Sequence, residues 1–358
     1  MADILPFLKS LLSVPGLSGH EGPVARLIER QWRPLSDELS LGRLGSVHAL
    51  KRGSRAAPRP SILLAAHMDA IGLIVTQVQD GFLRVDAIGG VDARILPGQA
   101  VTVHATGGGR QDDLPGLVVM PPARLLPPGA GDGAVELPHL FVDLGLLPLQ
   151  VAESVRVGDL VSFGAEAVEM SGEIVSGHSL DNRASVAAVT LCLQELQSTS
   201  HAWDVWAVAT VQEEVTFGGA ATSAFQLRPS LAVAVDATYG QGPGADGWNT
   251  FPIGKGPTLG YGPNIHPALY RRFKELAEQL EIPYATEFMP DSSGTDGMAM
   301  QVTAGGIPNF VLGIPIRNMH TPVEMAALKD IQRAGRLLAG FVSRLEADFL
   351  ETITWDAT

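Results

Sequence analysis

The 358-residue sequence has one cysteine, few aromatic residues and no long uninterrupted apolar segment. The lone cysteine, Cys192, excludes an intramolecular disulfide and fits a reducing compartment. It lies in the apolar segment AAVTLCLQEL, which favours a buried small side chain over a reactive thiol. No segment reaches the roughly 18 consecutive apolar residues of a membrane span, and the start MADILPFLKSLL has no basic region ahead of an apolar stretch. We therefore predict a cytoplasmic protein that is neither exported nor inserted in a membrane.

Positive charge is also scarce. The chain has 25 Lys and Arg against 38 Asp and Glu, a formal net charge of −13. Such a chain would repel phosphates, so we expect no nucleic-acid partner. An acidic balance suits multivalent cations, although charge alone does not identify a metal site. The hydrophobic fraction of 46% predicts a well-packed core. At roughly 150 residues per domain, the length predicts about two domains.

Short apolar runs alternate with helical segments in both the first and the last parts of the chain. Apolar side chains recur at helical spacing near residues 5–12 and 24–32, over about 182–197 and 266–280, and in a closing helix from Leu328. The segments ILLAAHMD, WAVATVQ, LAVAVD and NFVLGI favour buried strands. This alternation is typical of an α/β domain with a mostly parallel sheet flanked by helices. We assign it to residues 1–70 and 171–358.

Residues 71–170 have a different pattern. Short alternating stretches such as GFLRVDAI, QAVTVHA, GLVVM and DLVSFGA are separated by Gly, Pro and Asp, and no long amphipathic helix interrupts them. This pattern predicts a small all-β unit inserted into the α/β domain. Within it, residues 121–138 are rich in Pro and Gly and predict a long mobile loop.

Most of the informative polar residues directly follow the predicted strands. The carboxyl ends of parallel strands form one edge of a sheet, and ligands bind at that edge. Four distant segments would therefore deliver polar side chains to one place: His67 and Asp69, Glu213 and Glu214, Asp236, and His320. Asp181 joins them at the start of a predicted helix, either as an N-cap or as a metal ligand shared between two ions.

Each of these residues also has a purely structural interpretation. A single histidine after a strand is commonly a hydrogen-bonded loop residue, and Asp236 alone could open a turn. Glu213 and Glu214 are adjacent, so on extended backbone they would point in opposite directions. Taken together, the residues favour a metal site over separate structural roles, because several carboxylates converging on one edge are costly unless cations compensate their charge. The sequence therefore favours a metal centre.

The types of ligand atom limit which metals could bind. Mixed nitrogen and oxygen ligands suit zinc, cobalt or manganese, and no cysteine competes. Five ligands with one of them bridging would hold two ions about 3.5–4 Å apart. His67 and Asp69 are two residues apart, so Asp69 could accept the second ring N–H of His67 and fix its orientation.

Five segments, AAHMDAIG, SLDNRAS, VQEEV, AVD and HTPVE, occur in an order that resembles the M42 family of metallo-aminopeptidases, which includes the tetrahedral and glutamyl aminopeptidases. PGLSGHEGPV, GGVDARILPGQAV, LFVDLG and SSGTDGMA extend the similarity over nearly the whole chain. The resemblance implies a di-zinc exopeptidase-like α/β fold. Its inserted β domain, barrel-like and spanning residues 71–170, would mediate dimerisation and assembly of dimers into a dodecamer.

The resemblance also assigns roles. It implies that His67, Asp181 and Asp236 hold one divalent ion and that Asp181, Glu214 and His320 hold the other, with zinc expected and cobalt or manganese as alternatives. Glu213 would be the general base that activates water and passes its proton to the leaving amine. Asp69 would act at the catalytic centre by orienting His67. Substrates would be short peptides with a free N-terminus.

The chain departs from the family pattern at two places. The family often continues the Glu pair with a Gly and, soon after, an Arg-Gly-Ala, whereas this chain reads EEVTFGGA with Thr216, Phe217 and Gly218. His178 stands where lysine is commoner, as a pH-sensitive neighbour of the site or as a simple loop residue. Arg94 and Arg317 are candidates for a basic rim that would favour acidic substrates, but spacing does not place them.

Of three other functions, a metal-dependent deacylase is the strongest alternative on this sequence. A metal-dependent deacylase of the same architecture would use the same ligands on another bond. A glycoside hydrolase fits less well, because it relies on a carboxylate pair without metals. A non-catalytic assembly protein would have lost a ligand or the base, yet all six positions are filled.

Overall fold

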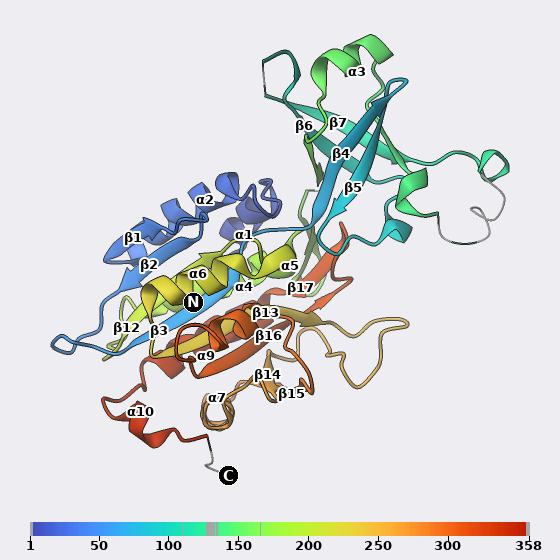
Figure 1. Ribbon diagram of the computed structural model, residues 1–358. Helices are drawn as coiled ribbons and strands as arrows, with labels where there is room; N and C mark the ends of the chain where they lie inside the picture. The colour runs from blue at the N-terminus through green and yellow to red at the C-terminus, as the bar shows by residue number, and fades with distance from the viewer. Residues whose placement is uncertain (1–2, 110, 127–132, 134, 165, 356–358) are drawn as a thin grey trace.

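A computed structural model describes residues 3–109, 111–126, 133, 135–164 and 166–355. These residues form an eleven-stranded sheet with helices packed against it and a closed six-stranded barrel that projects from one end of the sheet (Figure 1). Each part has its own hydrophobic core. The chain is therefore an α/β protein with a separate small β unit. Residues 127–132 and 134 of the loop predicted for residues 121–138 lie outside the described residues.

The sheet has the strand order β1-β2-β12-β3-β13-β16-β17-β11-β10, with β14 paired to β16 and β15 paired to β14. Its strands, in chain order, are β1 (Glu38–Leu41), β2 (Val47–Lys51), β3 (Ser61–His67), β10 (Val168–Met170), β11 (Ile174–Gly177), β12 (Asp204–Thr210), β13 (Leu231–Tyr239), β14 (Thr258–Tyr261), β15 (Ala285–Phe288), β16 (Asn309–Arg317) and β17 (Glu324–Ala327).

The four central strands β12, β3, β13 and β16 are parallel neighbours, and almost every residue in them is buried. The expectation of a mostly parallel sheet holds for this centre but is wrong for the sheet as a whole. The flanking pairs β1-β2, β2-β12, β16-β17, β17-β11 and β11-β10 are antiparallel. The outermost strands β1 and β10 are largely exposed, and an antiparallel edge tolerates contact with water where a parallel one does not.

The helices pack in groups on this sheet (Figure 1). Helix α4 contacts β3 and β13 and packs closely on α9, whereas α6 and α8 contact each other and cover β12, β13 and β16. The helices are α1 (Leu5–Leu12), α2 (Gly22–Trp32), α3 (Pro148–Ser154), α4 (Leu180–Glu195), α5 (Glu213–Thr216), α6 (Gly218–Leu227), α7 (Pro267–Gln279), α8 (Asp296–Gln301), α9 (Leu328–Val342) and α10 (Phe349–Thr352). Short 3-10 turns span Arg33–Leu35, Ala93–Ile95, Gly107–Gly109, Ala123–Leu125 and Leu137–His139.

The barrel closes in the order β4-β5-β8-β7-β6-β9. Its strands are β4 (Gly72–Gln79), β5 (Phe82–Ile88), β6 (Ala100–Ala105), β7 (Asp112–Val119), β8 (Phe141–Asp143) and β9 (Leu160–Phe163). Apolar side chains such as Leu73, Val103 and Val161 fill its interior. Strand β4 starts five residues after β3 ends, so the barrel begins at the carboxyl edge of the main sheet.

One buried arginine links the elements that approach this edge. Arg183, near the start of α4, is 1% exposed. Its guanidinium donates hydrogen bonds to the main-chain oxygens of Leu11 in the last turn of α1, of Val14 after α1, and of Met68 after β3. Burial lowers the pKa of Arg183 to about 10, so the side chain stays charged at neutral pH. It therefore fixes the end of α1 and the loop after β3 against the first turn of α4.

Replacing Arg183 with Met should destabilise the protein by about 3–5 kcal/mol, because three buried carbonyl groups lose their donor while the side-chain volume is nearly kept. Urea unfolding followed by tryptophan fluorescence measures the change. Arg30→Met on the exposed face of α2 is the matched control and should change stability by less than about 0.5 kcal/mol. Equal unfolding midpoints for the two variants would contradict this structural role.

Candidate metal centre

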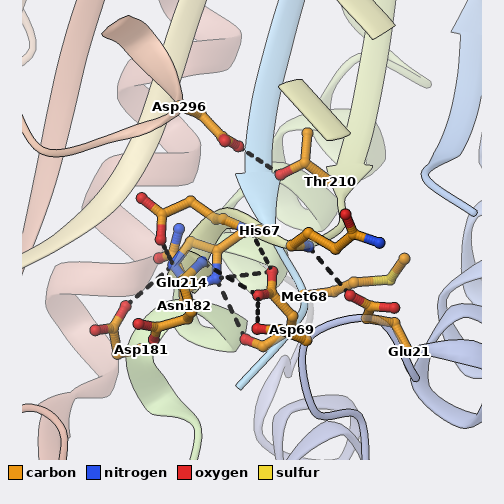
Figure 2. Close-up of polar contacts among 12 residues, drawn as sticks. Glu21, His67, Met68, Asp69, Asp181, Asn182, Thr210, Glu214 and Asp296 are labelled. Carbon is orange, nitrogen blue, oxygen red and sulfur yellow. Dashed lines mark hydrogen bonds and ion pairs between the residues drawn. The ribbon is translucent and has the colours of Figure 1, made fainter. Parts of the chain in front are cut away.

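The structure brings the predicted site residues together at the carboxyl edge of the parallel strands. His67 is the last residue of β3, and Glu213 follows the end of β12. Asp236 lies within β13, three residues before that strand ends, and His320 follows β16. Asp181 comes from the start of α4. Figure 2 shows several of these side chains, with the carboxylates gathered around the His67 ring.

Asp181 lies between the two histidines. Its Oδ1 is 3.3 Å from Nε2 of His67, and its Oδ2 is 3.3 Å from Nε2 of His320. Asp236 Oδ1 is 3.5 Å from the same nitrogen of His67, and Glu214 Oε2 is 3.4 Å from that of His320. Two clusters of nitrogen and oxygen donors therefore share one carboxylate. Asp181 has non-helical backbone angles, so it precedes the regular part of α4.

The expectation that Glu213 and Glu214 follow on extended backbone is wrong. They are the first two residues of the short helix α5, directly after Gln212 turns the chain with a left-handed backbone conformation. Both side chains line the same cavity but face different histidines. Glu213 Oε2 is 3.6 Å from His67 Nε2, whereas Glu214 faces His320.

Asp69 holds this turn in place and is completely buried. Its carboxylate accepts hydrogen bonds from the amides of Glu213 (3.1 Å) and Glu214 (3.3 Å) and from the hydroxyl of Ser18 (2.5 Å). His67 Nδ1 lies 3.2 Å from the main-chain oxygen of Asp69 and 3.5 Å from its Oδ1. The ring nitrogen of His67 thus lies nearer the main-chain oxygen of Asp69 than its carboxylate, and the carboxylate fixes the backbone that carries both glutamates.

Glu324 has a comparable role that the sequence analysis did not assign. It is buried, and its two carboxylate oxygens accept hydrogen bonds from the amides of Asp181 (3.0 Å) and His320 (2.9 Å). Its place in the HTPVE segment, four residues after His320, was the available signal. Asp296, from SSGTDGMA, was missed in the same way; it accepts a hydrogen bond from Thr210 beside the site (Figure 2).

The crowding of carboxylates changes their acidity. Burial, and then repulsion from Asp236, Asp296 and Asp181, raises the pKa of Glu213 to about 10. Burial and the neighbouring Asp181 raise the pKa of Glu214 to about 8. These carboxylates are therefore reluctant to be charged together in the absence of a cation.

The same carboxylates favour the protonated, positively charged form of the two histidines. The hydrogen bond to Asp181 raises the pKa of His320 to about 9. Burial alone would lower the pKa of His67, but Glu213 and the other carboxylates around its ring outweigh burial and raise it. Burial also works against the Asp181 carboxylate, yet the two histidines hold its pKa well below the usual value. These shifts show that negative charge exceeds positive charge at this site.

The residues fit divalent metal ions. Two groups, His67 with Asp181 and Glu214, and His67 with Glu213 and Asp236, each bring their donor atoms within 4.8 Å of one another. Oε1 of Glu214 is buried without a hydrogen-bond partner in the part of the chain that the structure describes. A buried carboxylate oxygen without a donor is costly, and a cation among these donors would remove that cost.

The site opens into a cavity of about 310 Å³. Phe217, one of the departures from the M42 pattern, forms part of its wall. The loop after β5 lies against the ring of His320. A Cβ added at Gly90, in the loop after β5, would lie 2.7 Å from Nδ1 of His320, so only glycine allows this approach. The neighbouring Gly89 has a left-handed backbone conformation.

The other residues noted in the sequence lie apart from the cluster of ligands. His178 is buried edge-on to Phe163 in the wall of a larger cavity of about 540 Å³, and burial lowers its pKa to about 3. It is therefore a neutral packed residue at neutral pH. Arg94 pairs with Asp92 on the surface, and Arg317 donates to the main-chain oxygen of Gln241. Neither arginine lines the site cavity.

Comparison with known proteins identifies the family. The sequence profile of the M42 glutamyl aminopeptidases matches residues 45–337. The chain belongs to the M42 family. The lysyl aminopeptidase of Pyrococcus furiosus is 33% identical to this M42 chain over 344 residues, which are 95% of the chain and 96% of that protein.

Solved structures agree. A TET aminopeptidase from the marine sediment archaeon Thaumarchaeota archaeon SCGC AB-539-E09 is 28% identical and has a TM-score of 0.91, with 98% of this M42 chain and 99% of that chain covered. TET1 peptidase of Pyrococcus horikoshii is 26% identical with a TM-score of 0.81, covering 96% and 100%, and it can assemble into a tetrahedron or a large octahedral shell.

Family membership confirms the resemblance drawn from the sequence motifs. This M42 chain is an aminopeptidase, an enzyme that hydrolyses peptides at their N-terminus, and the family depends on metal. Within the described residues, no helix has the length and apolar character needed to cross a bilayer.

The metal-free protein should lose stability as the pH rises from 6 to 9. The raised pKa values of Glu213 and Glu214 mean that the folded state keeps protons that the unfolded state releases above about pH 4.5. His320, with its pKa raised to about 9, adds stability below pH 6.5 that is lost as the pH passes 9. Each proton contributes about 1.4 kcal/mol per pH unit.

Thermal unfolding in chelator at pH 6, 7.5 and 9 measures this effect. Adding Zn²⁺ or Co²⁺ should reduce the fall in melting temperature, because a bound cation replaces the protons. A melting temperature in chelator that stays level or rises over this range would contradict the electrostatic description of the site.

Proposed function

We propose that the chain is a two-metal aminopeptidase acting on short peptides. One divalent ion would be held by His67, Asp181 and Asp236, and the other by Asp181, Glu214 and His320. The observation that carries this proposal is the position of Asp181, with each carboxylate oxygen 3.3 Å from a different histidine. A shared carboxylate between two donor clusters is the arrangement that a two-metal hydrolase requires. Zinc, cobalt and manganese all suit these donors.

Divalent ions at this site would lower the pKa of water and polarise the scissile carbonyl group. The protein's own contribution to proton transfer is Glu213. Its carboxylate lies beside the ligand cluster, 3.6 Å from His67 Nε2, without being needed in either ligand set. It takes the proton from the attacking water and delivers it to the nitrogen of the leaving amine. Asp69 positions Glu213 through its main-chain amide and orients His67.

The size of the cavity supports action at the end of a peptide. About 310 Å³ is at the lower end of the range for small-molecule sites and suits a terminal residue with its scissile bond. The loop at Gly90 packs closely against the ring of His320. Short peptides with a free N-terminus are therefore the proposed substrates.

Replacing Glu213 with Gln should lower kcat on an aminoacyl p-nitroanilide at least about 100-fold, because the amide cannot accept the water proton. Metal content, measured by mass spectrometry after dialysis, should stay near that of the wild type. Glu275→Gln on the exposed face of α7 is the matched control and should keep full activity. Unchanged turnover in the Glu213 variant would rule out this mechanism.

The same assay separates the proposed function from a deacylase. After chelation and re-addition of single metals, the wild-type enzyme should cleave substrates with a free amine and not their N-acylated forms. Cleavage of the N-acylated forms alone would favour the deacylase.

We also propose that the chain forms dimers through the barrel, and dodecamers from these dimers. Large apolar side chains are exposed on this unit in the single chain, including Leu147 (68%), Leu149 (79%) and Val157 (66%). An exposed apolar group of this kind commonly marks a contact between proteins. The P. horikoshii TET1 peptidase shows that a protein of this fold can form a large shell.

Light scattering after size-exclusion chromatography should give about twelve times the 37.7 kDa chain mass. The double variant Leu147→Glu, Leu149→Glu should release smaller species, because two charges would be buried at the contact. Leu41→Glu on strand β1 is the matched control and should leave the mass unchanged. A monomeric wild type would contradict the proposal.

A further inference from the structure

One carboxylate in the wall of the site cavity belongs to neither proposed ligand set. Glu287, on β15, lines the cavity together with Thr238, Ser293 and Thr295. Its Oε1 accepts a hydrogen bond from the hydroxyl of Thr238 and its Oε2 accepts one from the hydroxyl of Thr258, each 2.6 Å long. The two hydroxyls hold the carboxylate in one orientation.

Glu287 has no cationic partner. Among the ion pairs within the described part of the chain, none includes this residue, and its two donors are neutral. Burial raises the pKa of Glu287, and the nearby Asp236 raises it further. Carboxylates taken out of water are normally paired with a positive charge, so this partly buried one carries an uncompensated cost that a cation entering the cavity would relieve.

The position of Glu287 relates it to the substrate. Thr238 is two residues beyond the proposed ligand Asp236 on β13, so the two side chains project from the same face of the strand about 6–7 Å apart along it. A peptide whose first carbonyl group lies at the metal centre would therefore place its first side chain within reach of Glu287.

The rest of the cavity suits a long side chain with an apolar stem. Phe217, Tyr239 and Met319 line it beside the polar threonine and serine residues. Lysine and arginine side chains combine methylene groups with a cationic end, so they fit such a wall with a carboxylate beyond it. An acidic side chain would meet Glu287 and Asp236 as like charges.

We propose that Glu287 is a specificity-determining residue that selects peptides with lysine or arginine at the N-terminus. The cationic end of that side chain pairs with the Glu287 carboxylate while Thr238 and Thr258 keep the carboxylate oriented. This inference rests on the proposed aminopeptidase function, because the scissile bond must lie at the metal centre for Glu287 to face the first side chain.

The test compares lysine with norleucine, which has the same unbranched carbon stem and no charge. For the metal-loaded wild type, kcat/KM on lysyl p-nitroanilide should exceed that on norleucyl p-nitroanilide. Glu287→Gln keeps the shape and removes the charge; one threonine hydroxyl can still donate to the amide oxygen, and the other can accept from the amide NH2 group. It should lower the ratio of the lysyl to the norleucyl kcat/KM at least about tenfold, mainly because kcat/KM on the lysyl substrate falls. Glu275→Gln should leave the ratio unchanged.

Three outcomes would overturn the assignment. The wild type could cleave the norleucyl substrate as well as the lysyl one. The ratio could stay unchanged in the Glu287 variant. Both substrates could lose activity equally in that variant, which would mean that Glu287 acts on the amino group or on the fold rather than on the side chain.

A binding measurement separates this inference from the proposed function. Calorimetric titration of the metal-loaded wild type with L-lysine and L-norleucine requires no turnover. Tighter binding of lysine that is lost in Glu287→Gln supports the role of Glu287 even if no peptide is hydrolysed, whereas hydrolysis of free-amine substrates without this binding difference supports the aminopeptidase and overturns the role of Glu287.

Discussion

The structure depends on the crowding of buried negative charge at the carboxyl edge of the parallel strands. Asp181, Asp236, Glu213 and Glu214 meet there around His67 within a few ångströms. Each carboxylate raises the cost of ionising the next, and burial adds to it. Such a cluster is stable only if protons or cations are bound, so metal binding and folding of this edge are coupled.

A second set of carboxylates supports the first through the backbone. Asp69 accepts amide hydrogen bonds from Glu213 and Glu214, and Glu324 accepts them from Asp181 and His320. Amide donors stabilise a buried carboxylate without adding a competing cation, so these acids fix the ligand segments and leave the centre of the cluster for metal.

The sequence predicted the meeting of the strand ends because parallel strands necessarily present their last residues at one edge. It also predicted the barrel, because its short alternating strands differ from the buried runs of the main sheet. It missed Glu324 and misplaced Glu213, since both depend on where main-chain amides point after a turn. The approach of Gly90 to His320 was equally invisible, because it joins two units far apart in the chain.

The hydrogen-bond donors around each acid at the site indicate the role of its charge. Asp69 and Glu324 are satisfied by amides of the chain, so their charge is used in shaping the site. Glu287 has only two neutral hydroxyls and faces the cavity, so its charge remains available to something that enters from solution. In the proposed function, the same surplus of negative charge has two roles. Divalent ions would neutralise it at the reacting bond, and the cationic side chain of the substrate would neutralise it one side-chain length away. Catalysis and selectivity in this chain follow from one electrostatic imbalance.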